Sequence, residues 1–157
     1  MNNKNKQLDV SQITDYLYIS AWPRGDHVET IQALNIRLIL SMHWIRPSKN
    51  LGDSQVGLLW LPTFDTPITP IPMNTLKRGV EAAPPVIQKG GCVLSHCRAG
   101  VHRSVAMACS VLIAKGYSAD QAIQLTKEQR LVADPDVWYI RRRINKFEQV
   151  WNVHSHP

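Results

Sequence analysis

Residues 96–104 read HCRAGVHRS, and the interpretation of the whole chain follows from them. They lie between Gly91–His96, a short apolar run suited to a central strand, and Val105–Ala114, an Ala-rich run that predicts a buried helix because it is apolar all round. The chain from Cys97 to Arg103 must therefore bend between a strand and a helix N-terminus, and Gly100 can adopt the positive φ that such a bend needs. Backbone N–H groups that converge at a helix N-terminus bind anions. We expect this cradle to consist of Arg98, Ala99, Gly100, Val101, His102 and Arg103.

Cys97 lies where the electrostatic field of this cradle acts on a thiol. A cysteine at a helix N-terminus, close to amides and a guanidinium, has its pKa lowered from ~8.5 to roughly 3.5–7.5 and is a thiolate at neutral pH. Arg103 can grip two oxygens of a bound phosphate. The chemistry that fits is attack by sulfur on phosphorus, and Ser104 can donate a hydrogen bond that eases the later departure of the sulfur. The alternative is an inert buried thiol. It is disfavoured because Gly100 and Arg103 follow Cys97 at the spacing that the anion-binding bend requires.

The other reactive side chains nearby have ordinary structural interpretations. His96 is expected to support the loop by hydrogen bonds, and the ligand spacing excludes a zinc site made of His96, Cys97 and His102. Cys92 and Cys109 are predicted to fill the core. The strand between Cys92 and Cys97 spans ~16 Å, whereas bridged Cα atoms lie within ~7 Å. We therefore expect no metal and no disulfide that protects Cys97.

A leaving alkoxide or phenoxide needs a proton, so this chemistry requires an acid. Asp65 and Glu81 are the acidic residues between Leu58 and Cys97. Asp65 follows a predicted strand in the proline-rich loop Thr63–Pro72, whereas Glu81 falls in a predicted helix. Because α/β sheets place their sites on loops at strand ends, Asp65 is the candidate general acid, and then the base for the hydrolytic water. The alternative is an aspartate that only forms a turn.

The stretch 96–104 matches, at every fixed position, the HCxxGxxR signature followed by Ser or Thr of cysteine-dependent protein phosphatases. With Asp65 upstream and a strand at Tyr16–Ser20, the chain resembles a small dual-specificity phosphatase over most of its length. The resemblance implies an α/β fold whose central sheet is mixed, mainly parallel and flanked by helices. It also implies a hydrolase that acts on phosphotyrosine and on phosphoserine or phosphothreonine of proteins, with a phosphocysteine intermediate and no metal or organic cofactor.

Two alternatives to this function stay open. Arg98 and His102 add basic groups to the loop and suggest a highly charged substrate, such as a phosphoinositide or another polyphosphorylated small molecule. A non-catalytic phosphate-binding module is the other alternative, which the presence of nucleophile, guanidinium, hydroxyl and acid disfavours. The partner is thus a phosphorylated protein or a phosphorylated small molecule or lipid.

The remaining segments alternate between strand and helix patterns and end in helices, which indicates an α/β sheet flanked by helices. Strands are predicted at Tyr16–Ser20, Ile36–Met42, Leu58–Leu61 and Gly91–His96. Helices are predicted at Asp26–Leu34, at Asn74–Ala83 with a break or kink at Pro84-Pro85, at Val105–Ala114, from a Ser118 cap to about Arg130, and from an Asp134-Pro135 start onward. The apolar residues of the last helix form one stripe: Val137, Ile140, Ile144, Phe147 and Trp151.

Three polar or basic features receive no catalytic role. Arg130 stands near the place of a basic pocket residue in relatives, but a charge at a helix C-terminus explains it equally well. His43, Trp44 and Arg46 follow a strand and either line the pocket rim or are packing and solvated residues. The run 141–143 is interpreted as the solvent face of a helix, and no nucleic-acid motif accompanies it, so no nucleic-acid partner is expected.

The composition of the chain limits the class of protein to which it can belong. The chain has 157 residues, 44% hydrophobic and 19% charged, which favours one globular domain over residues 1–157 and disfavours disorder. The net charge of 18 − 12 = +6 favours anionic partners. Three cysteines are too few for a disulfide scaffold. Residues 1–9 are polar and predict a flexible lead without a signal peptide, and no run approaches the ~18 apolar residues of a membrane span. We expect a cytoplasmic protein; its oligomeric state is open.

Overall fold

The computed structural model describes residues 7–155. Its five strands form one sheet in the order β1-β2-β5-β3-β4, in which β1 runs antiparallel to β2 and all other neighbours are parallel. The strands are β1 Val10–Thr14, β2 Leu17–Ser20, β3 Ile36–Ser41, β4 Gly57–Trp60 and β5 Cys92–His96. The α-helices are α1 Val28–Ala33, α2 Met73–Gln88, α3 Arg103–Ala114, α4 Ala119–Gln129 and α5 Trp138–Ser155. Short 3₁₀ turns lie at Gly25–His27 and Lys49–Leu51. The predicted fold class, a mixed and mainly parallel sheet flanked by helices, is confirmed.

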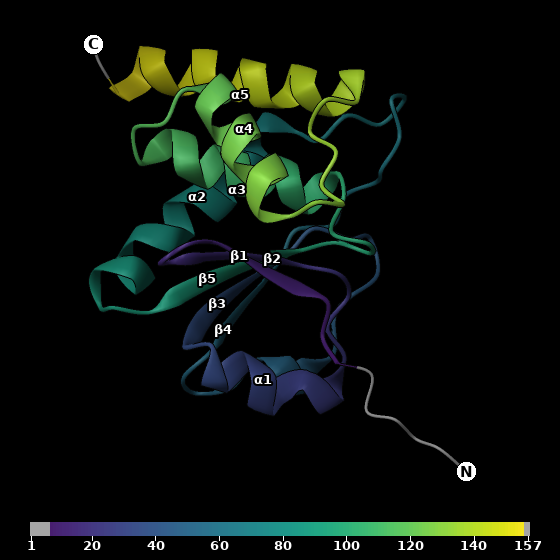
Figure 1. The fold of residues 1–157 in the computed structure, drawn as a ribbon, viewed down its shortest axis with the longest axis vertical. Coiled ribbons are helices and arrows are strands. Elements are labelled where there is room, and N and C mark those ends of the chain that lie inside the picture. Colours follow the sequence, from purple (N-terminus) through teal and green to yellow (C-terminus); the bar gives the residue numbers. More distant parts are fainter. Residues whose placement is uncertain (1–6, 156–157) are drawn as a thin grey trace.

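Helices cover both faces of the sheet, α1 on one side and α2 to α5 on the other (Figure 1). The larger apolar cluster lies between the sheet and α2 to α5, and the smaller one lies on the α1 side. The central strands β3 and β5 are almost entirely buried because both faces are covered, which explains their near-continuous apolar sequences. Helix α3 is buried along nearly its whole length, as its all-round apolar composition predicted.

The end of the chain packs as its stripe predicted, but its helix begins later. Ile140, Ile144 and Phe147 are buried in the larger cluster, and Val137 and Trp151 pack against it. Helix α5 starts at Trp138, so the predicted start at Asp134-Pro135 is wrong. The tertiary contact explains this difference, since the backbone amide of Asp134 donates to the Val101 carbonyl at 3.0 Å and thus ties this segment to another loop.

One further boundary was wrong, and one strand was not predicted. Helix α2 continues through Pro84 and Pro85 to Gln88 instead of ending at Ala83. Both prolines are exposed, and Val86 and Ile87 behind them pack on the core, so tertiary packing offsets the lost backbone hydrogen bonds. Strand β1 was not predicted, because an edge strand with a single fully buried residue carries little apolar pattern. The predicted Ser118 cap of α4 is confirmed, with a reciprocal hydrogen-bond pair to Gln121.

Part of the lead predicted to be flexible is packed. Leu8 is buried in the smaller cluster, and the Asp9 carbonyl accepts a hydrogen bond from the Ala21 amide at 2.9 Å. Gln7 is exposed, and residues 1–6 of the predicted flexible lead lie outside the described residues.

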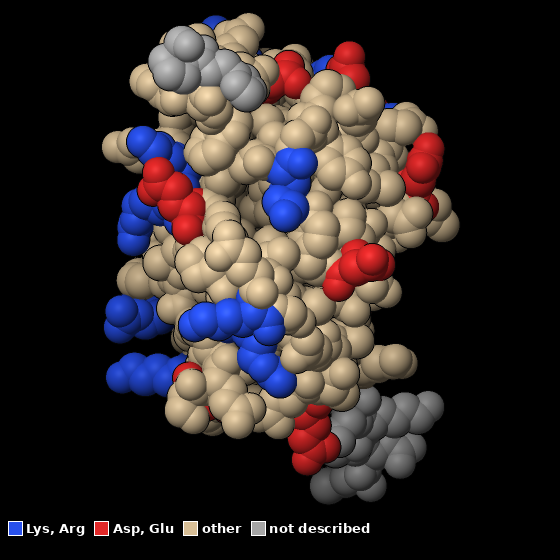
Figure 2. Space-filling model, turned by 90° about the vertical axis from the view of Figure 1, so that its left-hand side faces the viewer, with Lys and Arg blue, Asp and Glu red and all other residues tan. Residues whose placement is uncertain are grey.

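Two global features bear on partners. On the face shown in Figure 2, Lys and Arg side chains lie in separate groups with acidic and uncharged residues between them, so the net charge of +6 is not gathered into one patch on that face. Over residues 7–155, no helix combines the length and the apolar character that a membrane crossing needs.

Candidate active site

The loop between β5 and α3 lies at the edge of the sheet where the parallel strands β2, β3, β4 and β5 all end (Figure 1). Backbone hydrogen bonds tie it to its neighbours on three sides. The amide of Met42 donates to the His96 carbonyl at 2.8 Å, and the amide of Trp22 donates to the Arg98 carbonyl at 2.9 Å. The Val101 carbonyl accepts from the segment before α5. The path of the loop is therefore imposed by the strands and helices around it as well as by its own residues.

Gly100 has the positive φ that the sequence predicted, 68°. A Cβ atom at this position would lie 2.6 Å from Nη2 of Arg130 and 2.7 Å from the carbonyl oxygen of Ser20. Both distances are shorter than any real Cβ contact. Glycine is thus required here for conformation and for space.

Cys97 follows β5 at the bottom of this loop and is only 3% exposed. Its sulfur lies 3.2 Å from the Ser104 hydroxyl oxygen. Burial is the largest influence on the pKa of this thiol and raises it. The Ser104 hydroxyl and amide, the Arg103 charge and the amide of Gly100 act in the opposite direction and hold the pKa below its ordinary value. The thiolate is thereby favoured.

The other two cysteines contrast with Cys97. Cys92 and Cys109 are buried, as predicted, and all three cysteines are free. Burial raises the pKa of the Cys109 thiol to about 12, and it also raises the pKa of Cys92. Cys97 alone combines a lowered pKa with a position at a helix N-terminus.

Arg103 is the first residue of α3 and is 5% exposed. One of its terminal nitrogens, Nη1, donates to the Thr63 carbonyl at 2.9 Å. Its Nε is buried and has no hydrogen-bond partner within residues 7–155. Arg103 thus has a buried guanidinium donor without a protein acceptor, and it lies six residues after the Cys97 thiol. This arrangement fits an anion held between the guanidinium and the sulfur.

Asp65 lies in the loop after β4, and both of its carboxylate oxygens accept hydrogen bonds. Nδ1 of His102 donates to Oδ2 at 2.8 Å, and the hydroxyl of Tyr139 donates to Oδ1 at 2.7 Å. Burial and the negative carboxylate raise the pKa of Tyr139 to about 12, which keeps the phenol protonated as a donor. The structure thus brings the predicted acid to the loop that carries residues 96–104, which we call the signature loop. Glu81, the other acidic residue considered, pairs with Lys77 on α2.

His102 and Tyr139 take positions that the sequence did not reveal. The His102 side chain, interpreted as an extra basic group for the substrate, turns to Asp65 and lies 3.7 Å from Asp134 Oδ2 on its other side. Tyr139 lies outside the apolar stripe of α5, and its contact joins residues 74 positions apart. No local sequence pattern marks such a contact.

His96 is fully buried behind Cys97. Its Nδ1 donates to the Cys97 carbonyl at 3.1 Å, which matches the expected support of the loop. Burial lowers the pKa of His96 to about 4, so the ring is neutral at physiological pH. The ring also packs edge-on against Trp22 at 5.5 Å between centroids.

Arg130, for which the sequence predicts no catalytic role, is 2% exposed and holds the signature loop. Its Nε donates to the Gly100 carbonyl at 2.8 Å, and Nη2 donates to the Ala99 carbonyl at 3.1 Å. The same guanidinium binds the Asp9 carboxylate and the Ser11 hydroxyl at 3.0–3.1 Å. It therefore connects the loop to the start of β1. Its position at the end of α4 was visible in the sequence, but its inward direction was not.

The residues after β3 form an aromatic edge beside the site. His43 is 2% exposed and stacks on Trp44, whose ring stacks in turn on Phe64 at 6.4 Å between centroids. Arg46 lies over the Trp60 ring at 5.0 Å. Of the residues suggested for the rim, Trp44 is exposed and His43 belongs to the packed layer beneath it.

Comparisons with known proteins show what this chain is similar to. A family model described as "Dual specificity phosphatase, catalytic domain" matches residues 17–149. Tyrosine-protein phosphatase yvh1 of Schizosaccharomyces pombe is 26% identical over 141 residues, 89% of this chain and 42% of that protein. Dual specificity phosphatase 28 of Mus musculus is 32% identical over 95 residues, 60% of this chain and 57% of that protein. The alignments thus span roughly half the length of these curated relatives.

Solved structures share the fold. A mouse putative dual specificity phosphatase complexed with zinc tungstate superposes with a TM-score of 0.84 and 23% identity over 99% of this chain and 96% of that chain. PTPMT1 in complex with PI(5)P superposes with a TM-score of 0.82 and 21% identity over 93% of this chain and 98% of that chain. At these identities the likeness concerns the arrangement of the elements.

Proposed function

Since this chain belongs to the dual specificity phosphatase family, we propose that it hydrolyses phosphomonoesters through a phosphocysteine intermediate. The single observation that carries the proposal is the pairing of a buried thiol of lowered pKa with a buried, unpartnered guanidinium donor on the same loop, Cys97 and Arg103. A thiolate is a nucleophile, and a guanidinium stabilises charge on phosphoryl oxygens. The combination suits transfer of a phosphoryl group to sulfur.

The first step transfers the phosphoryl group to the enzyme. The amides of residues 98–103 and Arg103 hold three phosphoryl oxygens, and the Cys97 thiolate attacks phosphorus from the opposite side to the ester oxygen. As the S–P bond forms, the P–O bond breaks, and its electron pair goes to the ester oxygen. Protonated Asp65 gives that oxygen its proton, so the product leaves as an alcohol or a phenol.

The second step regenerates the thiol site. Asp65, now a carboxylate, takes a proton from water, and the water oxygen attacks phosphorus. The S–P bond breaks as inorganic phosphate forms, and the Ser104 hydroxyl at 3.2 Å stabilises the departing sulfur by a hydrogen bond. His96 keeps the loop in place. Every group in these steps comes from the chain, so we propose that the reaction proceeds without a metal ion.

The proposed substrates are proteins phosphorylated on tyrosine and on serine or threonine. A phosphoinositide or another polyphosphorylated small molecule is the second candidate, and the exposed side chain of Arg98 in the signature loop favours it. His102 no longer supports that candidate, because its ring binds Asp65. We further propose one catalytic domain over residues 1–157 and a cytoplasmic location, which the free cysteines favour.

Hydrolysis of p-nitrophenyl phosphate in excess EDTA tests the reaction. We expect turnover that vanadate blocks and that Cys97→Ser abolishes, while Cys109→Ser, a matched change at a buried cysteine outside the mechanism, retains it. Rapid acid quenching should trap a phosphorylated Cys97. Activity in Cys97→Ser, or turnover without a phosphoenzyme, contradicts the mechanism. A panel of phosphopeptides and phosphoinositide vesicles then ranks the substrates.

A further inference from the structure

Large apolar side chains are exposed around the candidate active site more than anywhere else on the described chain. We define the apolar rim as the six that border the site and are more than half exposed: Trp44, Phe64, Ile68, Leu131, Val132 and Trp138. Ile68 is 88% exposed and Leu131 is 92% exposed. Among residues 7–155, Val153 near the end of α5 is the one comparably exposed large apolar residue away from the site, at 70%. Single exposed apolar residues need no explanation, but a set grouped beside one site marks an interaction surface.

Contacts and neighbours along the chain place the apolar rim beside the candidate site, with Ile68 three residues after Asp65 in the same loop. Trp44 and Phe64 stack on each other, and Phe64 is next to the acid, Asp65. Trp138 packs edge-on against Tyr139 at 5.8 Å, and Tyr139 binds Asp65. Leu131 and Val132 directly follow Arg130, whose guanidinium binds the carbonyls of the signature loop. These segments gather at the same edge of the fold, on the right in Figure 1.

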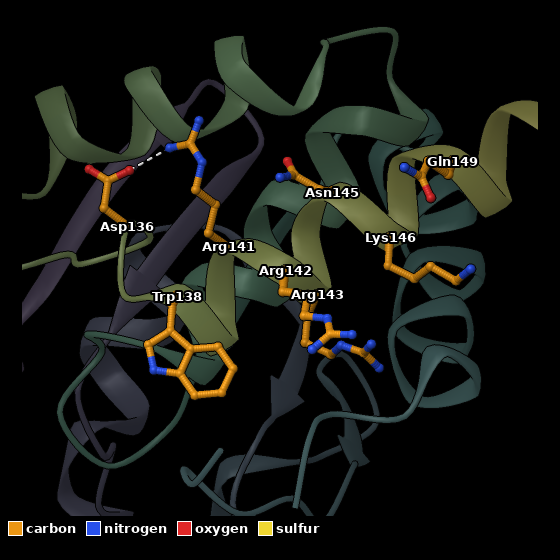
Figure 3. Close-up of a pocket in the computed structure, with 8 residues that line it drawn as sticks. All are labelled: Asp136, Trp138, Arg141, Arg142, Arg143, Asn145, Lys146 and Gln149. Carbon is orange, nitrogen blue, oxygen red and sulfur yellow. Dashed lines mark hydrogen bonds and ion pairs between the residues drawn. The ribbon is translucent and has the colours of Figure 1, made fainter. Parts of the chain in front are cut away.

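Basic side chains accompany the apolar ones. Arg98 is exposed in the signature loop itself. Figure 3 shows Trp138, Arg142 and Lys146 projecting from the same side of α5, while Arg141 turns away to Asp136. The acidic Asp136 is neutralised there, since it pairs with both Arg141 and Lys127. The surface that borders the site thus combines exposed apolar side chains with the basic side chains of Arg98, Arg142 and Lys146, while the half-exposed Asp134 lies 3.7 Å from His102.

We propose that the apolar rim docks this edge of the protein on an anionic lipid bilayer, with Ile68 and Leu131 entering the bilayer interface and Arg98 and Arg142 binding headgroup phosphates. A bilayer is a better occupant than a protein because the most exposed side chains project singly from separate loops. A protein partner needs a matching pocket for each, whereas a fluid interface accepts them all. Tryptophan rings, here Trp44 and Trp138, are suited to the headgroup level, and basic side chains are attracted to anionic lipids. Docking in this way turns the signature loop toward membrane-bound phosphate groups.

Sedimentation of the full chain with vesicles tests the docking without reference to catalysis. We expect binding to phosphatidylcholine vesicles that contain phosphatidylserine, weaker binding to pure phosphatidylcholine, and weakening by added salt. The double change Ile68→Ser with Leu131→Ser should lower the partition coefficient at least about tenfold, because two large apolar side chains are lost from the interface. Val153→Ser, a matched change at an exposed apolar residue off the rim, should bind as the native chain does.

The outcomes separate docking from the proposed reaction. Hydrolysis of p-nitrophenyl phosphate by the double variant reports on folding and on the reaction, and it should be unchanged. No binding of the native chain to anionic vesicles, or equal binding of native chain and double variant, overturns the docking proposal. If the double variant instead loses activity on a phosphopeptide in the absence of vesicles, the rim contacts protein substrates, and the proposal is likewise overturned.

Discussion

Arg130→Met tests whether a buried guanidinium outside the signature sequence holds the phosphate cradle. Methionine keeps much of the side-chain length but removes every donor. The buried Gly100 carbonyl then loses its charged partner at 2.8 Å, while the exposed Ala99 carbonyl can turn to water. The Asp9 carboxylate is 62% exposed and is also rehydrated. The cost is therefore dominated by one buried acceptor and the lost charged hydrogen bonds, about 2–4 kcal/mol of unfolding free energy.

Thermal unfolding and steady-state kinetics measure the two consequences. For a chain of this size we expect the melting temperature to fall by roughly 5–15 °C. We also expect KM for p-nitrophenyl phosphate to rise, because the carbonyls that orient the cradle are no longer fixed. Arg141→Met is the matched control: this arginine also binds carboxylates, those of Asp120 and Asp136, but it is 38% exposed, so the change should cost no more than about 1 kcal/mol. If Arg130→Met melts and turns over like this control, Arg130 does not hold the loop.

Three further predictions concern the acid, the glycine and the buried histidine. Asp65→Asn should lower kcat on phenyl phosphate, whose phenoxide is a poor leaving group, by a factor of about 10²–10⁴. Tyr139→Phe should lower this kcat several-fold without a change in melting temperature. An unchanged rate in Asp65→Asn assigns the acid elsewhere. Gly100→Ala should reduce kcat/KM at least about tenfold, since the new Cβ meets backbone 2.7 Å away, whereas Gly90→Ala, also at positive φ but with nothing within 4 Å, should keep the native value; equal kinetics in the two variants would refute the steric argument. The pKa of His96 is about 4 in the folded chain, against an ordinary value of 6.5. Between these two pH values the unfolded chain binds more protons than the folded chain does. The free energy of unfolding therefore decreases by up to about 3 kcal/mol as the pH is lowered through this window. Urea unfolding at several pH values should show this slope in the native chain and a shallower one in His96→Asn; parallel slopes would show that another group is responsible.

Local patterns were sufficient to predict one cluster of side chains. The thiol of Cys97, Gly100, the guanidinium of Arg103 and the hydroxyl of Ser104 lie within eight residues of each other, so the bend between a strand and a helix brings them together. Asp65 was predicted to lie near this loop for a different reason, since only Asp65 and Glu81 are acidic between Leu58 and Cys97 and Asp65 follows a strand, and the structure does bring it to His102.

Contacts between distant segments were not predicted, and they changed several assignments. Arg130 reaches Asp9 across 121 positions, and Tyr139 reaches Asp65 across 74. Helix α2 passes Pro84 and Pro85 because the apolar residues behind them find the core. The sequence shows the secondary-structure propensity of each segment. Packing energies outweigh these propensities, and they depend on which surfaces contact each other in the fold.

The order of the amino acids thus predicted a covered, mainly parallel sheet and a bend between a strand and a helix that carries a cysteine, because each arises from residues that are neighbours along the chain or repeat with a regular period. The fold alone decided which side chains bind Asp65, that Arg130 supports the loop between β5 and α3, and that exposed apolar residues of separate loops lie beside that loop. These features depend on how far apart segments lie in space, which burial of the core determines and which no short stretch of sequence records.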